Sequence, residues 1–386
     1  MRSFFLPLGL ILSPSLALAQ EAPSEPVVEG PAIDLPDAVG LPPSLADAVE
    51  RDGSGDPVEG RSLSDQAMAL ALAATVLSDW DLALIHAERA AAAGEPLGAT
   101  LAGHILLQGL SERGEDEAAA VRWLRRAGEQ GEADALVILS RLAAASRAGL
   151  EPFQAREFLA TAAESGDARA AHEYGLYLME AGDPGAAASA IDWLRLASES
   201  GRVEAFSDYA EAVGDWVHGP GDLTTARLWY ERAGQSGDGL AATIAGTMYM
   251  QGEGGPADPE RGAALIQMGA ELGSPAAMGS YALILFQGAP GVPADPIRAA
   301  SWALQGAELG DGESQFLYAY ALATGDGVDL DYERAFYWVR RAAAPRASGL
   351  SDDDDRAALE AALRRVLPGP AQDRIEAEAA ADSTGF

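Results

Sequence analysis

The chain has 386 residues, and its hydrophobic content of 48% supplies enough apolar side chains for a folded core. Its net charge of −33 gives it a surface that repels nucleic-acid phosphates and anionic lipids. Every basic residue is arginine, which excludes a phosphate-loop lysine, a lysine Schiff base and a lysine-assisted serine nucleophile. The absence of cysteine excludes thiol catalysis, disulfides and thiolate metal sites.

Residues 1–19 have the pattern of a cleavable signal peptide. Arg2 precedes a largely apolar run, and Ala17 and Ala19 are the small residues that a signal peptidase reads, so cleavage is expected after Ala19. Pro7 and Pro14 interrupt the run, which is also too short for a stable membrane anchor. The mature protein is therefore expected to be periplasmic or secreted.

Residues 20–61 form a segment crowded with Pro, Gly, Asp and Glu, without a sustained apolar period. This composition predicts a disordered acidic arm. The stretch from Asp52 to Asp56 resembles a calcium loop only weakly, since Pro57 stands where the turn glycine is needed and Leu63 where the bidentate glutamate is needed. A linker is the better interpretation.

A pattern with a period of about 36 residues organises the rest of the chain. A small residue is followed three positions later by a large one, then by two small residues and a closing glycine, a spacing that predicts one helix (helix B) with a left-handed glycine after its end. The small residues are Ala83, Ala120, Ala155, Ala190, Ala226, Gly262, Ala299 and Ala335. The large residues are His86, Trp123, Phe158, Trp193, Trp229, Leu265, Trp302 and Trp338. The closing glycines are Gly94, Gly131, Gly166, Gly201, Gly237, Gly273 and Gly310.

A second helix (helix A) follows each closing glycine. Pairs such as Tyr174-Gly175 and Tyr281-Ala282 recur eight and nine positions past the glycine and mark this helix. Small residues four positions past the glycine allow it to pack closely on its neighbours, so the unit is a helical hairpin. An aspartate four positions before the small residue of helix B is expected to cap that helix, and the series is Asp222, Asp258, Asp295 and Asp331. These observations predict an all-α solenoid, a right-handed superhelix of about eight hairpins spanning residues 62–346.

The columns resemble Sel-1-like repeats (SLR), a family related to tetratricopeptide repeats. The resemblance is carried by the helix A sequence that ends at Gly254, by the aspartate of the following loop and by the helix B sequence from Ala335 to Ala343. It departs from the pattern in the first copy, which has His86 in the aromatic column, and in the third, where Ser140 and Ser146 replace small or glycine positions.

Beyond the repeats, residues 347–370 predict a capping helix, and residues 371–386 are expected to be a disordered tail. Asp352 to Asp355 would favour the helix start, and Leu359, Leu363 and Val366 would bury against the last repeat.

No motif indicates catalysis, a metal site or a cofactor. The histidines are His86, His104, His172 and His218, and none is spaced as a pair of metal ligands. The chain is therefore expected not to be an enzyme.

Partner binding is expected on the face of helix A opposite its packing columns, since residues six, ten and fourteen positions past each glycine share that face. These residues are His104, Gln108, Arg141, His172, Glu180, Glu211, Asp215, Gln251, Gln287, Tyr320 and Thr324. Glu180, Glu211 and Asp215 would form an acidic stripe that suits a basic protein or peptide partner.

The SLR resemblance implies an exported, non-enzymatic scaffold or adaptor that holds a protein or peptide in its groove, with roles such as envelope signalling or polysaccharide regulation. The alternative is a secreted hydrolase or binder of cell-wall or β-lactam-type substrates, which the resemblance to cysteine-rich secreted relatives also implies. The absence of cysteine and lysine weighs against that alternative.

Overall fold

The computed structural model describes residue 42 and residues 44–45, 62–180, 184–214, 221–343 and 353–383. These residues form helices and no strand, apart from an isolated bridge between Ala289 and Val292. The expected signal peptide, most of the expected arm, Asp215, His218 and Asp352 lie outside the described residues.

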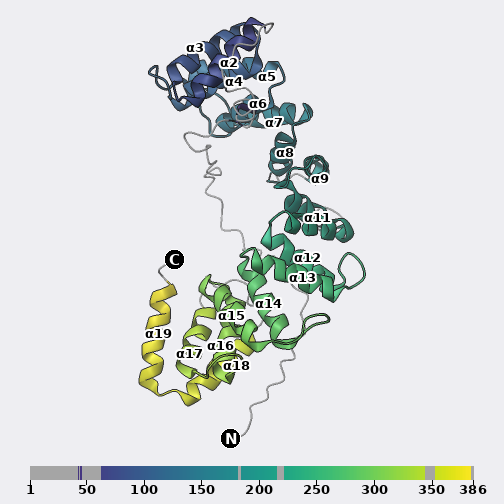
Figure 1. Cartoon of the computed structure of the whole chain (residues 1–386), viewed down its shortest axis with the longest axis vertical. Helices are drawn as coiled ribbons and strands as arrows, with labels where there is room; N and C mark the ends of the chain where they lie inside the picture. Colours follow the sequence, from purple (N-terminus) through teal and green to yellow (C-terminus); the bar gives the residue numbers. More distant parts are fainter. Residues whose placement is uncertain are drawn as a thin grey trace. The chain divides into compact units, whose positions relative to one another are not determined.

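The chain divides into two compact units, which Figure 1 shows as stacked helical hairpins. The N-terminal unit includes residues 30–236, and the C-terminal unit includes residues 237–252 and 256–386. The helices of the N-terminal unit are α2 (Leu63–Val76), α3 (Trp80–Ala92), α4 (Pro96–Gln108), α5 (Glu117–Glu129), α6 (Ala133–Ala144), α7 (Phe153–Glu164), α8 (Ala168–Glu180), α9 (Pro184–Glu199), α10 (Ala205–Gly214) and α11 (Leu223–Gln235). Those of the C-terminal unit are α12 (Gly239–Gln251), α13 (Pro259–Glu271), α14 (Pro275–Gln287), α15 (Pro296–Glu308), α16 (Gly312–Thr324), α17 (Tyr332–Ala342), α18 (Asp353–Val366) and α19 (Gly369–Ser383).

Even-numbered helices from α2 to α16 are the A helices, and odd-numbered helices from α3 to α17 are the B helices. The predicted aspartate caps are confirmed: Asp258, Asp295 and Asp331 each accept a hydrogen bond from the backbone N–H three residues later. Asp222 accepts from the N–H groups of Thr224 and Thr225. The predicted hairpin repeat is therefore correct, and in these four copies an aspartate marks where helix B begins.

Two classes of glycine shape the hairpins. The closing glycines have φ values from 86° to 109°, and a Cβ on any of them would meet nothing within 4 Å, so these sites need glycine for its conformation. Gly103 and Gly246 lie inside helix A, where a Cβ would come within 2.7 Å of Leu124 and 2.6 Å of Ile266 in the following helix B. These sites need glycine for space.

The aromatic column of helix B lies at the edge of the core. Each tryptophan from Trp193 onward packs on a tyrosine of its own repeat's helix A, with ring centroids 5.4 Å apart for Tyr209 and Trp229 and 5.9 Å apart for Tyr318 and Trp338. Leu265 and Trp338 in this column are buried, and the other tryptophans of the column are half-buried.

The end of the chain differs from the prediction of a disordered tail. Residues 369–383 form α19, which packs along α17 (Figure 1). Ile375 and Ala379 supply the apolar stripe of α19 and are buried. Of the predicted capping residues in α18, Leu363 is buried and Leu359 half-buried, but Val366 is 57% exposed. The cap therefore consists of two helices, α18 and α19.

The arm also has a folded part. Pro42 and Leu45 are buried in the N-terminal unit, and the N–H of Leu45 donates to the carbonyl of Pro42 in a short helical turn. The expectation of an arm without secondary structure is therefore wrong for this short segment.

Candidate partner-binding face

The residues predicted on the free face of the A helices differ in exposure. Glu180, Glu211, Gln287 and Thr324 are exposed, Gln108, Arg141, Gln251 and Tyr320 are half-buried, and His104 and His172 are buried. The predicted face is therefore partly surface and partly interior.

His104 in α4 is a core residue. His104 is 3% exposed, and its Nε2 atom has no hydrogen-bond partner among the described residues. Burial lowers the pKa of His104 to about 4, so the imidazole is neutral at neutral pH. The prediction of a surface position for His104 is wrong, because α4 is apolar around its whole circumference.

His172 and Arg141 are accessible only in part, and both are paired with a neighbouring A helix. The His172 Nε2 atom lies 2.5 Å from an Oδ2 of Asp208 in α10, and Arg141 at the end of α6 donates to Glu173 of α8 at 2.9 Å. Both predicted binding residues thus connect successive repeats, and their polar groups are already engaged within the protein.

Asp134 and Arg169 complete this interhelical network, and the sequence analysis missed both. Asp134 in the first turn of α6 forms an ion pair with Arg169 in the first turn of α8. Both residues lie three positions past a closing glycine, and Glu173 and Asp208 lie seven positions past one. Positions three, seven, ten and fourteen past the closing glycine lie on one stripe of helix A. Opposite charges on this stripe in neighbouring repeats could therefore have indicated ion pairs between successive A helices.

Acidic side chains also gather at the N-termini of three successive A helices. Glu95, Glu132 and Asp167 each directly follow a closing glycine and stand at the N-cap position. Asp167 accepts from the N–H of Ala170 at 2.7 Å, whereas Glu95 and Glu132 make no side-chain cap bond. Burial raises the pKa of Glu132, and the charges of Asp167 and Glu95 raise it further. A positive group is therefore favoured at this edge.

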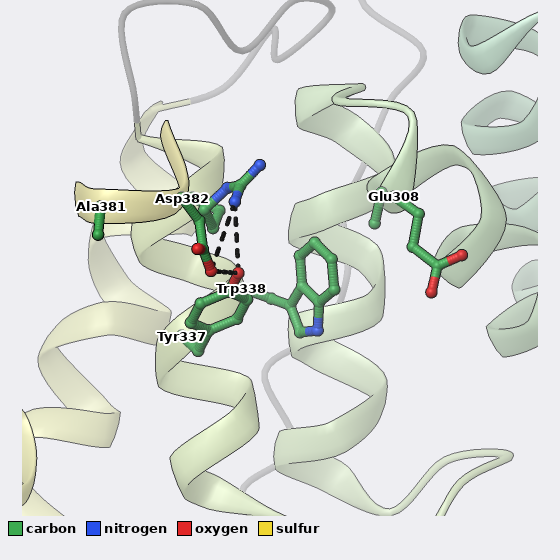
Figure 2. Close-up of a pocket in the computed structure, with 7 residues that line it drawn as sticks. Glu308, Tyr337, Trp338, Ala381 and Asp382 are labelled. Carbon is green, nitrogen blue, oxygen red and sulfur yellow. Dashed lines mark hydrogen bonds and ion pairs between the residues drawn. The ribbon is translucent and has the colours of Figure 1, made fainter. Parts of the chain in front are cut away.

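A hollow lies in the C-terminal unit between α15, α17 and α19 (Figure 2). The Tyr337 hydroxyl donates to Asp382 at 2.6 Å, and Arg341 donates to the same hydroxyl at 3.3 Å. Glu308 stands on the other side of the Trp338 ring from this network. Burial and the hydrogen bond to Asp382 raise the pKa of Tyr337. The polar groups of this hollow mainly satisfy one another and fix α19 on α17.

Two kinds of feature are missing from the described part of the chain. No group of three or more histidine, aspartate or glutamate side chains is arranged there to hold a metal ion. None of the helices in the described ranges combines the length and the hydrophobicity that a membrane span requires.

The repeats match a known family model. The model described as "Sel1 repeat" matches residues 96–132, 168–201, 210–238, 240–274, 275–311 and 312–344, which together cover more than half of the chain. The chain belongs to the Sel1 repeat family. The hairpins that the model does not match, α2–α3 and α6–α7, are the copies in which the sequence departs from the repeat pattern. Sel1 repeat proteins typically mediate protein–protein interaction.

Two solved structures of Sel1 repeat proteins show the same fold. The uropathogenic Escherichia coli protein c5321, described as a protective antigen displaying an SLR fold, is 18% identical with a TM-score of 0.55, and the match covers 88% of this chain and 92% of c5321. A Sel1 repeat protein from Oxalobacter formigenes is 21% identical with a TM-score of 0.57, and the match covers 84% of this chain and 89% of that protein. None of the curated proteins matches the chain in sequence.

Proposed function

We propose that this Sel1 repeat chain is an exported, non-enzymatic scaffold that binds a protein or peptide with a basic surface along the A helices of its N-terminal unit. The observation that carries the proposal is the pair of exposed acids, Glu180 and Glu211, on the successive A helices α8 and α10. These carboxylates extend from a scaffold whose other polar groups are largely engaged in pairs between repeats. They are therefore available to an incoming partner on the A helices.

Export rests on the leader-like residues 1–19 and fits the composition. A chain with a net charge of −33 and no cysteine is compatible with an oxidising, salt-exposed compartment. Envelope signalling or polysaccharide regulation is the setting that we propose for the scaffold.

The test begins with crosslinking in the native host, followed by mass spectrometry to identify the partner. The partner's association rate is then measured with the Glu180→Gln/Glu211→Gln/Asp215→Asn variant. We expect slower association and a weaker dependence on salt, with unfolding free energy within about 1 kcal/mol of wild type, because exposed charges contribute little to stability but steer encounter.

A matched control removes three exposed acids from the B helices: Glu129 in α5, and Glu157 and Glu164 in α7. The Glu129→Gln/Glu157→Gln/Glu164→Gln variant changes the net charge by the same amount on the other helix of the hairpin. If both triple variants slow association equally, the A helices are not the recognition surface.

A further inference from the structure

A short piece of the arm already occupies a site in the N-terminal unit. Leu45 is 0% exposed and belongs to the hydrophobic cluster that contains Leu101 and Leu139. The backbone N–H of Ser44 donates to an Oδ2 of Asp134 at 2.6 Å. Leu45 and Ser44 therefore supply one apolar anchor and one main-chain donor, as a bound peptide would.

Asp134 is suited to receive such a donor. It is buried at the start of α6, and its other carboxylate oxygen is paired with Arg169 of α8. This pairing fixes the orientation of the carboxylate, so the acceptor for Ser44 is preorganised. Neither the leucine nor the N–H depends on features unique to the arm, so other extended segments could make the same contacts.

The arm is a poor electrostatic match for its site. Glu132 lies beside Ser44, and Glu95 and Asp167 are close enough to raise the pKa of the Glu132 carboxyl. The stretch from Asp37 to Glu50 carries acids and no basic residue. A segment with the same leucine and a basic neighbour would gain attraction where the arm meets repulsion.

We propose that the start of α6 is a peptide-binding site, that the chain's own Ser44 and Leu45 occupy it as a tethered competitor, and that a partner segment with a leucine anchor and a basic flank displaces them. This inference deepens and rests on the proposed scaffold function, since it names the kind of partner segment. The tether keeps the arm at a high local concentration, while the small size of the contact keeps the arm exchangeable.

The test uses a fluorescein-labelled synthetic peptide of residues 38–49 and the chain from Gln20 to Phe386, with binding followed by fluorescence anisotropy. Leu45→Asp in the chain removes the anchor and vacates the site. The peptide should bind this variant about tenfold tighter than wild type, because the tethered competitor is lost. Leu63→Asp is the matched control, since Leu63 is 81% exposed at the start of α2 and should leave the affinity at the wild-type value.

A second pair of variants isolates the main-chain hydrogen bond. Ser44→Pro removes the N–H that Asp134 accepts while its fixed φ suits the helical turn, so it should vacate the site as Leu45→Asp does. Ser44→Ala keeps the N–H and removes only the hydroxyl, whose hydrogen bond lowers the pKa of Glu132, so a larger effect of Ser44→Pro than of Ser44→Ala measures the main-chain bond. In the peptide, Asp47→Arg should tighten binding to the vacated chain more than Asp47→Ala, because the site edge is acidic.

The outcomes separate the two levels of the proposal. Equal peptide affinity for wild type, Leu45→Asp and Leu63→Asp chains overturns the site. If the peptide behaves as expected but a crosslinked partner binds wild type and Leu45→Asp chains equally tightly, the displacement is overturned while the scaffold function stands. Failure of the scaffold function instead appears as the absence of any partner, whatever the peptide does.

Discussion

Acidification should destabilise the N-terminal unit through one residue, His104. This imidazole is buried in α4, and its Nε2 atom has no partner among the described residues. Its folded-state pKa of about 4 lies below the ordinary value of 6.5. The unfolded chain therefore binds a proton at a pH where the folded chain does not, and stability is lost as the pH falls from 6.5 toward 4.

The magnitude follows from the two pKa values. One pKa unit corresponds to about 1.4 kcal/mol, so the full loss below pH 4 is about 3 kcal/mol, and the loss at pH 5 is about 2 kcal/mol. His104→Leu replaces the imidazole with an apolar side chain of similar size that cannot be protonated. We expect this variant to lose the His104 part of the pH dependence and to be more stable than wild type at pH 5.

The assay is urea unfolding between pH 7.5 and 5, followed by hydrogen exchange and mass spectrometry so that α4 peptides report on the N-terminal unit. His86→Leu is the control, because His86 is only half-buried and a smaller part of the pH dependence should disappear with it. An unchanged pH dependence in His104→Leu would refute the reasoning, since it would mean that the folded protein accommodates the protonated imidazole.

Four further predictions concern the packing of the repeats and the stability of the C-terminal unit. Trp229→Ala should cost about 2 to 4 kcal/mol in denaturant melts, since the half-buried ring packs on Phe206 and Tyr209. At Gly131, where φ is 87°, Asn should be tolerated better than Ala. At Gly103, where Leu124 leaves no space for a side chain, Asn should be tolerated worse than Ala. Thermal melts of the four variants distinguish these cases. Ile375→Ala should cost about 2 to 4 kcal/mol in urea melts, and a value near zero would mean that α19 does not dock. Burial raises the pKa of Glu313 to about 7, so wild-type stability should fall as the pH rises from 4.5 to 7, and Glu313→Gln should flatten this dependence in melts across that range.

The repeat architecture could be predicted because each of its requirements restricts a single position. A positive φ selects glycine after helix B, a close helix contact selects a small residue within helix A, and an exposed helix start selects aspartate. These restrictions recur at a fixed spacing, so the hairpins were visible even in α6–α7, which the family model does not match. The two hairpins without a match diverge in the aromatic and glycine columns but keep the buried alanines Ala83 and Ala155.

The features that could not be predicted depend on what covers a helix rather than on the helix itself. The helical period placed His104 opposite the packing columns, but α4 is buried on all sides. Ile375 and Ala379 supply too few apolar side chains to identify α19 until α17 is present to receive them. Leu45 lies in an arm that is rich in proline and acid and has no sustained apolar period, so the sequence does not mark it as an anchor.

Exposed charges and a buried leucine anchor would contribute differently to partner binding. The ion pairs of Arg141 with Glu173 and of Asp134 with Arg169 engage these charges of the A helices within the protein, whereas the exposed acids Glu180 and Glu211 can attract a partner over a distance. Long-range attraction between exposed charges is screened by salt and acts mainly on association, whereas a buried leucine acts mainly on dissociation. In the proposed complex, salt should therefore slow association without shortening the lifetime of the complex to the same degree. Loss of the partner's leucine should shorten that lifetime at every salt concentration, because the anchor and the acidic stripe occupy different parts of the N-terminal unit.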